Sequence, residues 1–165
     1  MKVQKVIISS DLKELDFCRE KVEEFLRKNT KFDKTMIHAL VLAIDEAVSN
    51  VLVHGFDSTD RKNPSKNTLE IQMEFDKTRF LTKIQDNSSF FNPLEKLPKN
   101  EAEQKKMLKK ALKHNIQVGK GCGLGIAIYL KIMDKVLYEY DKKRGNILKL
   151  IKSQVFCNPL DFFIK

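Results

Sequence analysis

The sequence has few cysteines and no long uninterrupted apolar run. Its three cysteines (Cys18, Cys122 and Cys157) are odd in number and lack CxxC spacing, so neither a disulfide framework nor a zinc site is indicated. No uninterrupted apolar run approaches the ~20 residues that span a bilayer. In the first residues, MKVQKVIISSDLK, the apolar stretch is too short and too soon interrupted by charged residues to be a signal peptide. We therefore expect a cytoplasmic protein that does not associate with membranes.

Two common nucleotide-binding motifs are also missing. Four of the six glycines lie in GKGCGLG, but their spacing does not complete GxGxxG, and no Lys-Ser/Thr pair follows them as in a P-loop. A net charge of +9 favours anionic partners, which include nucleotides, nucleic acid and acidic protein surfaces. Aromatic and basic residues are not interleaved as in proteins that stack single-stranded bases. We expect no direct nucleic-acid binding, although a basic nucleic-acid-binding domain stays open as an alternative.

The spacing of apolar residues predicts helices and strands in one domain, residues 1–152, followed by a C-terminal extension, residues 153–165. Because strands and helices do not alternate regularly, we predict an α+β fold. It is a two-layer α/β sandwich whose mixed, mostly antiparallel sheet has helices on one face. The predicted strands are residues 3–8, 69–75, 79–85, 136–140 and 147–151. The predicted helices are a first helix with a buried stripe from Leu15 to Leu26, a central helix over residues 33–54, a lysine-rich helix over residues 99–114 and an apolar helix that follows the glycines.

Polar residues on the central helix form the first candidate site. Glu46, Asn50 and His54 are four residues apart, so they share one face of an otherwise apolar helix. One explanation is a polar edge that is partly exposed to water, as charged residues usually are. The other is a functional site, which the remaining motifs support.

Two further motifs lie later in the chain. Asp86 ends the second strand of a predicted hairpin. There a carboxylate could accept hydrogen bonds from the exocyclic amine of a ligand, or it could stabilise an Asx-turn. The glycines at 119, 121, 123 and 125 open an apolar helix. Alternate glycines at a helix N-terminus suit a phosphate cradle, and tight packing of a loop is the alternative.

Taken together and in order, three segments resemble one family. DEAVSNVLVHGF, IQDNSSFFNP and GKGCGLGIAI resemble the N, G1 and G2 boxes of the GHKL, or Bergerat-fold, ATPases. Within this superfamily the chain is most similar to the short anti-sigma-factor serine/threonine kinases of the RsbW type. The resemblance extends from about Val3 to Lys152, and FFNPLEK and the segment from GLGIAIYLKIMDKV to RGNILKLIK support this subgroup.

The resemblance implies ATP and Mg²⁺ as cofactors and a role for each box. Glu46 would be the general base, Asn50 would help to hold Mg²⁺, and Asp86 would bind the adenine amino group. Residues 99–118 would close as a lid over phosphates held by the glycine loop. The loop residues implied are Gly119, Lys120, Gly121, Gly123, Leu124 and Gly125. The implied partners are an anti-anti-sigma (STAS) protein, phosphorylated on serine or threonine, a sigma factor, and a second copy of the chain in a homodimer.

One position departs from the family pattern. The first glycine of the G1 box aligns with Ser88. If this position requires a positive φ, serine would cost about 1 kcal/mol and weaken ATP binding roughly fivefold. The alternative to an active kinase is therefore a catalytically weakened nucleotide-binding regulator that acts by protein binding alone.

Overall fold

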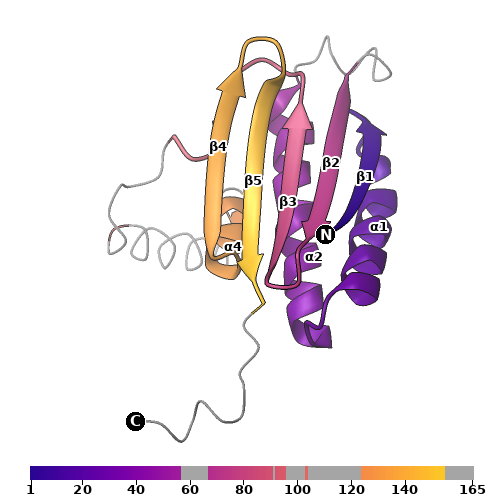
Figure 1. Ribbon diagram of the computed structural model, residues 1–165. Coiled ribbons are helices and arrows are strands. Elements are labelled where there is room, and N and C mark those ends of the chain that lie inside the picture. Colours follow the sequence, from indigo (N-terminus) through magenta and orange to yellow (C-terminus); the bar gives the residue numbers. More distant parts are fainter. Residues whose placement is uncertain (57–66, 91, 96–102, 104–123, 155–165) are drawn as a thin grey trace, which may run out of the picture.

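The computed structural model describes residues 1–56, 67–90, 92–95, 103 and 124–154. Within these ranges one β-sheet carries a layer of helices on one face (Figure 1), which confirms the predicted α+β two-layer sandwich. The strands are β1 (Lys2–Ser9), β2 (Thr68–Phe75), β3 (Arg79–Asp86), β4 (Lys135–Asp141) and β5 (Gly145–Ser153). The helices are α1 (Glu14–Asn29), α2 (Lys34–Asn50), η1 (Val51–Gly55) and α4 (Leu124–Ile132). The predicted lysine-rich helix and the lid, apart from Glu103, lie outside the described residues.

The five strands are arranged in the order β1-β2-β3-β5-β4, and every pairing is antiparallel. The prediction of a mixed sheet is therefore wrong for the described strands. β3 and β4 do run in the same direction, but β4 lies at the edge of the sheet (Figure 1). The β4–β5 hairpin places β5 between them, so the crossover through α4 creates no parallel pair. This order puts the end of β3 directly beside the start of β5.

Alternation along the strands gives the sheet one buried face and one open face. In β2 the buried residues are Leu69, Ile71, Met73 and Phe75, while Glu70, Gln72 and Glu74 between them are only partly buried. This period of two matches the sequence prediction, because successive side chains of a strand point to opposite faces. The apolar face packs against the helices and forms the core with them.

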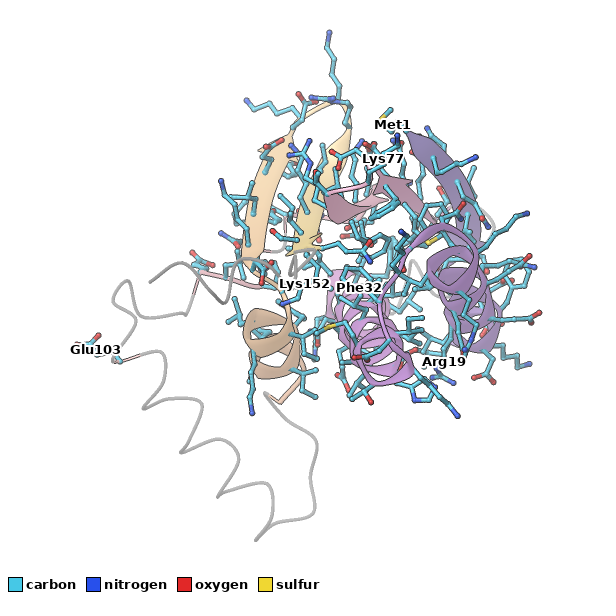
Figure 2. All side chains as sticks on the ribbon, turned by 60° about the horizontal axis from the view of Figure 1, so that its bottom comes forward. Met1, Arg19, Phe32, Lys77, Glu103 and Lys152 are labelled. Carbon is cyan, nitrogen blue, oxygen red and sulfur yellow. The ribbon has the colours of Figure 1, made fainter. Side chains whose placement is uncertain are left out.

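α2 is the central helix and lies between α1 and α4 (Figure 2). Asp33 caps it by accepting a hydrogen bond from the Met36 backbone N–H at 2.7 Å. The helix continues without a break into the π-helix η1, so the predicted helix over residues 33–54 is confirmed. By length and composition alone Lys34–Gly55 could cross a membrane, contrary to the sequence expectation. Its buried stripe against the sheet and both neighbouring helices fits a core helix instead.

Candidate functional site

Glu46 and Asn50 lie one turn apart on the face of α2 that meets the start of α4. Both are partly buried. The backbone of Gly125 comes so close that a Cβ atom built there would lie 2.6 Å from Glu46 Oε2 and 3.2 Å from Asn50 Nδ2. Only glycine leaves these two side chains in place. The structure thus brings together three of the predicted site residues, two from the N box and one from the G2 box.

The polar groups on this side have few partners. Asn50 Nδ2 is buried and has no hydrogen-bond partner among the described residues. Because a half-turn of the side-chain amide exchanges its nitrogen and oxygen, the same position can present either a donor or an acceptor. Buried polar groups are nearly always satisfied in native proteins, so an unsatisfied amide calls for an explanation. A bound ligand or ion is one.

Glu46 has the electrostatic character of a base. Burial raises the pKa of its carboxyl group above the ordinary value, and the negative charge of Asp45 raises it further. Asp45 itself is paired, since Arg19 Nη2 donates to its two carboxylate oxygens at 3.0 and 3.1 Å. Among the described residues no lysine or arginine pairs with Glu46 in the same way. A carboxylate with a raised pKa and no cation holding it is suited to accepting a proton.

The second side of the site is centred on Asp86, which is only 4% exposed. Its Oδ1 accepts hydrogen bonds from the Ser88 backbone N–H at 3.0 Å, from the Ser88 hydroxyl, and from Asn146 Nδ2 at 2.9 Å. The first of these is the Asx-turn considered from the sequence. The turn uses one oxygen only, and the hydrogen bonds that Asp86 accepts from Ser88 and Asn146 all go to Oδ1 rather than to Oδ2. Both sequence interpretations of Asp86 therefore remain compatible, with one oxygen for the turn and one for a ligand.

Asn146 and Tyr138 belong to this side, and sequence reasoning missed them. Asn146 lies directly opposite Asp86 in the β3–β5 register and is 3% exposed. The Tyr138 hydroxyl donates to Asn146 Oδ1 at 2.6 Å. The only sequence signal was an uncharged amide residue directly before the apolar pair Ile147 and Leu148. That signal acquires meaning once the register is known.

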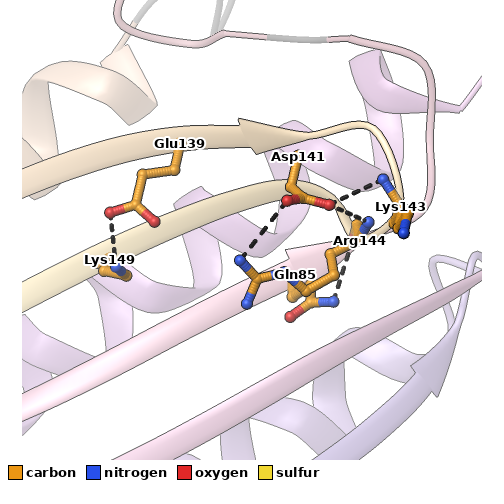
Figure 3. A network of polar contacts seen from close by, with 6 residues as sticks. All are labelled: Gln85, Glu139, Asp141, Lys143, Arg144 and Lys149. Carbon is orange, nitrogen blue, oxygen red and sulfur yellow. Dashed lines mark hydrogen bonds and ion pairs between the residues drawn. The ribbon is translucent and has the colours of Figure 1, made fainter.

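The β4–β5 turn packs tightly behind Asp86. Gly145 has a φ of +78°, and a Cβ atom there would lie 2.0 Å from the Asp86 backbone oxygen. Gln85 Nε2 donates to the Arg144 backbone oxygen at 3.1 Å, which ties the turn to β3 (Figure 3). Within the turn, the Asp141 carboxylate accepts from the Lys143 and Arg144 backbone N–H groups at 2.8 and 2.9 Å, and these bonds lower its pKa. The turn thus fixes the backbone position of Asp86.

Ser88 is not strained. Among the described residues only Lys77 and Gly145 have positive φ, so the condition under which serine would cost stability at position 88 is not met. The Ser88 side chain instead takes part in the hydrogen bonding around Asp86. A Cβ atom at Gly55 would lie 2.9 Å from Ser88 Oγ, so the glycine that ends η1 leaves room for this hydroxyl.

A narrow pocket connects the two sides. The space left free inside it is only about 10 Å³, roughly the room for one water molecule, which is far below the volume of a ligand pocket. A purine would therefore have to move its walls apart. The polar residues that line it are Asn50, Asp86, Tyr129, Tyr138 and Asn146, and the apolar ones are Ala47, Val51, Pro93 and Leu148.

The remaining predicted residues belong to the glycine loop. Gly119, Lys120, Gly121 and Gly123 lie outside the described residues, and Leu124 is the first residue of α4. The predicted helix after the glycines is confirmed. Its N-terminus begins one residue before Gly125, beside Glu46 and Asn50, where the positive end of the helix dipole favours anions.

Comparison with known families agrees with this geometry. The family profile described as a histidine kinase-like ATPase domain matches residues 8–152. The chain belongs to the histidine kinase-like ATPase domain family. This is the family of the GHKL fold, which also includes RsbW-type anti-sigma kinases, and it implies that the domain binds ATP and acts as a kinase-like enzyme. A comparison with curated proteins gives no significant match.

The residues of this ATPase domain fit the parts of ATP. Asp86 Oδ2 offers an acceptor to an exocyclic amine in a pocket whose walls combine apolar and polar side chains. The unsatisfied Asn50 amide and the close approach of Gly125 suit phosphates and their counter-ion. The described residues contain no cluster of three His, Cys, Asp or Glu side chains. A magnesium ion here would fit the usual pattern of few protein ligands completed by phosphates and water.

Proposed function

We propose that this ATPase domain is a serine/threonine protein kinase that acts as an anti-sigma factor in a partner-switching module. Its substrate would be a hydroxyl on an anti-anti-sigma (STAS) protein, and it would hold a sigma factor when the STAS protein is not bound to it. In this proposal the protein is cytoplasmic and works as a homodimer. The observation that carries the proposal is the Glu46 carboxylate, which has a raised pKa and lies against the start of α4 beside Asn50.

The chemistry requires a base next to the phosphate-binding end of the site. As the substrate oxygen bonds to the γ-phosphorus, Glu46 accepts the hydroxyl proton, the bond between γ-phosphorus and the bridging oxygen breaks, and ADP leaves. Asp86 holds the adenine ring and the N-terminus of α4 holds the phosphates. The reacting atoms are therefore positioned rather than activated covalently. When bound, Mg²⁺ would neutralise the phosphate oxygens, with Asn50 as its protein ligand.

The alternative of a catalytically weakened regulator loses its original motivation. It depended on strain at Ser88, and Ser88 has an ordinary φ. Its hydroxyl also supports Asp86 rather than disturbing it. We therefore favour an active kinase.

Calorimetry with Mg·ATP and Mg·ADP tests the nucleotide site, with Asp86→Asn as the variant. Asparagine replaces one acceptor oxygen by a donor, so the variant should lose a charge-assisted hydrogen bond worth about 1.5–3 kcal/mol, or roughly ten- to 150-fold in affinity. Asp76→Asn, a change of the same type in the β2–β3 turn, should leave affinity unchanged. Absence of wild-type binding at millimolar nucleotide contradicts the proposal at its first step.

Transfer of labelled γ-phosphate to purified STAS-domain proteins of the source organism tests the second step. A serine or threonine of one such protein should acquire the label. The wild-type kinase should bind that STAS protein before phosphorylation and release it afterwards. Tight nucleotide binding without transfer to any STAS protein would favour the regulator that acts by binding alone.

A further inference from the structure

Two tyrosines line the narrow pocket and differ in their hydrogen bonding. The Tyr138 hydroxyl donates to Asn146. Tyr129 is 0% exposed, and its hydroxyl has no hydrogen-bond partner within the part of the chain that the structure describes. Leaving a buried hydroxyl unsatisfied costs free energy, so such a group in a native protein needs a reason. The hydroxyl of Tyr129 is therefore available to a ligand in a way that the hydroxyl of Tyr138 is not.

The position of Tyr129 connects it to the site already described. It follows Gly125 by four residues on α4, so the two share the helix face that packs against α2. Gly125 meets Glu46 and Asn50, and Tyr129 lines the same pocket as Asn50 and Asp86. The described residues contain five buried side-chain atoms without a hydrogen-bond partner, and two of them, Asn50 Nδ2 and the Tyr129 hydroxyl, belong to residues that line this one pocket.

The chemistry of these groups matches one edge of adenine. An ionised carboxylate such as that of Asp86 accepts hydrogen bonds but cannot donate them, whereas a phenol hydroxyl can donate one. Burial raises the pKa of Tyr129, which keeps its hydroxyl protonated. Adenine carries a donor amine flanked on each side by a ring nitrogen that accepts, N1 or N7. Guanine carries a carbonyl oxygen in place of that amine, which would face the Asp86 carboxylate.

We propose that Tyr129 is a base-specificity residue of the nucleotide site, whose hydroxyl donates to a ring nitrogen beside the adenine amine while Asp86 accepts from the amine. This inference rests on the proposed binding of ATP. It adds a second polar contact to the base and places that contact on α4, the helix whose start approaches the phosphates. Base recognition and phosphate binding are thereby joined through one helix.

Tyr129→Phe tests the inference by two measurements that should move in opposite directions. Without nucleotide, removing an unsatisfied hydroxyl should raise the thermal midpoint by about 2–4 °C. Calorimetry should show ATP affinity reduced about 3- to 10-fold, the loss expected for one neutral hydrogen bond. A residue with a purely structural role would lower both stability and affinity, or leave affinity unchanged.

Nucleotide analogues identify the atom concerned. Of 1-deaza-ATP and 7-deaza-ATP, one lacks the ring nitrogen that Tyr129 contacts. Wild type and Tyr129→Phe should bind that analogue with equal affinity. They should differ in affinity for the other analogue as much as they do for ATP. Tyr138→Phe is the matched control in the same pocket. Because its hydroxyl is already bonded, this variant should lose stability without nucleotide and should not discriminate between the analogues.

The outcomes separate this inference from the proposed function. Equal ATP affinity of wild type and Tyr129→Phe, or the same loss for ATP and for both deaza analogues, overturns the role of Tyr129 and leaves the ATP site standing. Failure of wild type to bind ATP at all overturns both.

Discussion

The two sides of the site differ in how their polar groups are satisfied. Around Asp86, the Ser88 and Asn146 side chains and the β4–β5 turn form a connected network on a rigid backbone. Around Glu46 and Asn50, the Asn50 amide nitrogen lacks a partner among the described residues and the Glu46 carboxylate has a raised pKa. A site that recognises a nucleobase needs fixed geometry. A site for phosphates and proton transfer needs polar groups that stay unpaired until the substrate supplies their hydrogen-bond partners.

The glycines express the same contrast. A Cβ atom at Gly145 would meet the backbone of Asp86, which cannot move away without distorting β3. A Cβ atom at Gly125 would meet the end of the Glu46 side chain, which can rotate. One glycine therefore preserves the fold, and the other preserves the position of the proposed general base.

The largest effect is expected on the Glu46 side. Glu46→Gln keeps the shape of the side chain but cannot accept a proton, so phosphate transfer should fall by roughly 10² to 10⁴ while ATP affinity stays close to wild type. Single-turnover transfer and calorimetry measure the two quantities. A parallel loss of both would show that Glu46 binds nucleotide rather than acting as a base.

On the Asp86 side the largest effect is on stability. Gly145→Ala combines a positive φ with a contact at 2.0 Å, so the free energy of unfolding should drop by about 2–4 kcal/mol. Lys77→Gly is the matched control, because Lys77 has a φ of 77° in the β2–β3 turn. This change should stabilise by up to about 1 kcal/mol. Urea denaturation of both variants measures the two changes in the free energy of unfolding. Equal changes would contradict the claim that the close contact between Gly145 and Asp86 stabilises the fold.

A smaller effect on transfer is expected for Gly125→Ala. The new methyl group should displace the Glu46 carboxylate and lower transfer about ten- to a hundredfold, because small misplacements of reacting groups are costly. Stability should change by less than about 1 kcal/mol, since alanine also favours the helix. Lys131→Ala on the exposed surface of α4 serves as control for both readings. If Gly125→Ala instead unfolds the domain, the Glu46 side chain cannot move to make room for the methyl group. The Glu46 side would then be as rigid as the Asp86 side.

The smallest effect is a shift in pH dependence. Glu46 must be ionised to accept a proton, so transfer should decline as pH falls through its raised pKa. Arg19→Gln removes the cation that pairs with Asp45, which raises the pKa of Glu46 further and moves this decline to higher pH. Lys21→Gln, which removes the same charge from an exposed pair with Glu24 on α1, should leave the pH profile unchanged.

The sequence was sufficient for the elements and for the residues that come in local motifs. Strong periodicity in residues 69–75 and along α2 identified a strand and the central helix, because burial of one face imposes that spacing. Glu46 and Asn50 were recognisable because helical spacing alone places them together. Gly125 was part of a dense glycine cluster, which is itself a local signal.

What sequence reasoning missed depends on contacts between distant segments. Asn146 meets Asp86 only through the β3–β5 register, and Tyr129 was assigned to a wholly apolar helix with no reason to single it out. The strain considered for Ser88, which depended on a positive φ, does not arise, for a related reason. The sequence shows a missing glycine, but the backbone conformation that decides its cost is set by hydrogen bonds with Asp86 and Asn146.

The placement of β5 between β3 and β4 has a consequence for folding. Asp86 and Asn146 are separated by 60 residues in the chain, so their contact has high contact order and is expected to form late. During synthesis, β1, β2, β3 and both N-terminal helices emerge before β5 exists, and the nascent chain exposes the edge of β3 until then. The nucleotide site is thus completed by the last strand of the sheet, and binding of nucleotide would select chains whose final strand has docked.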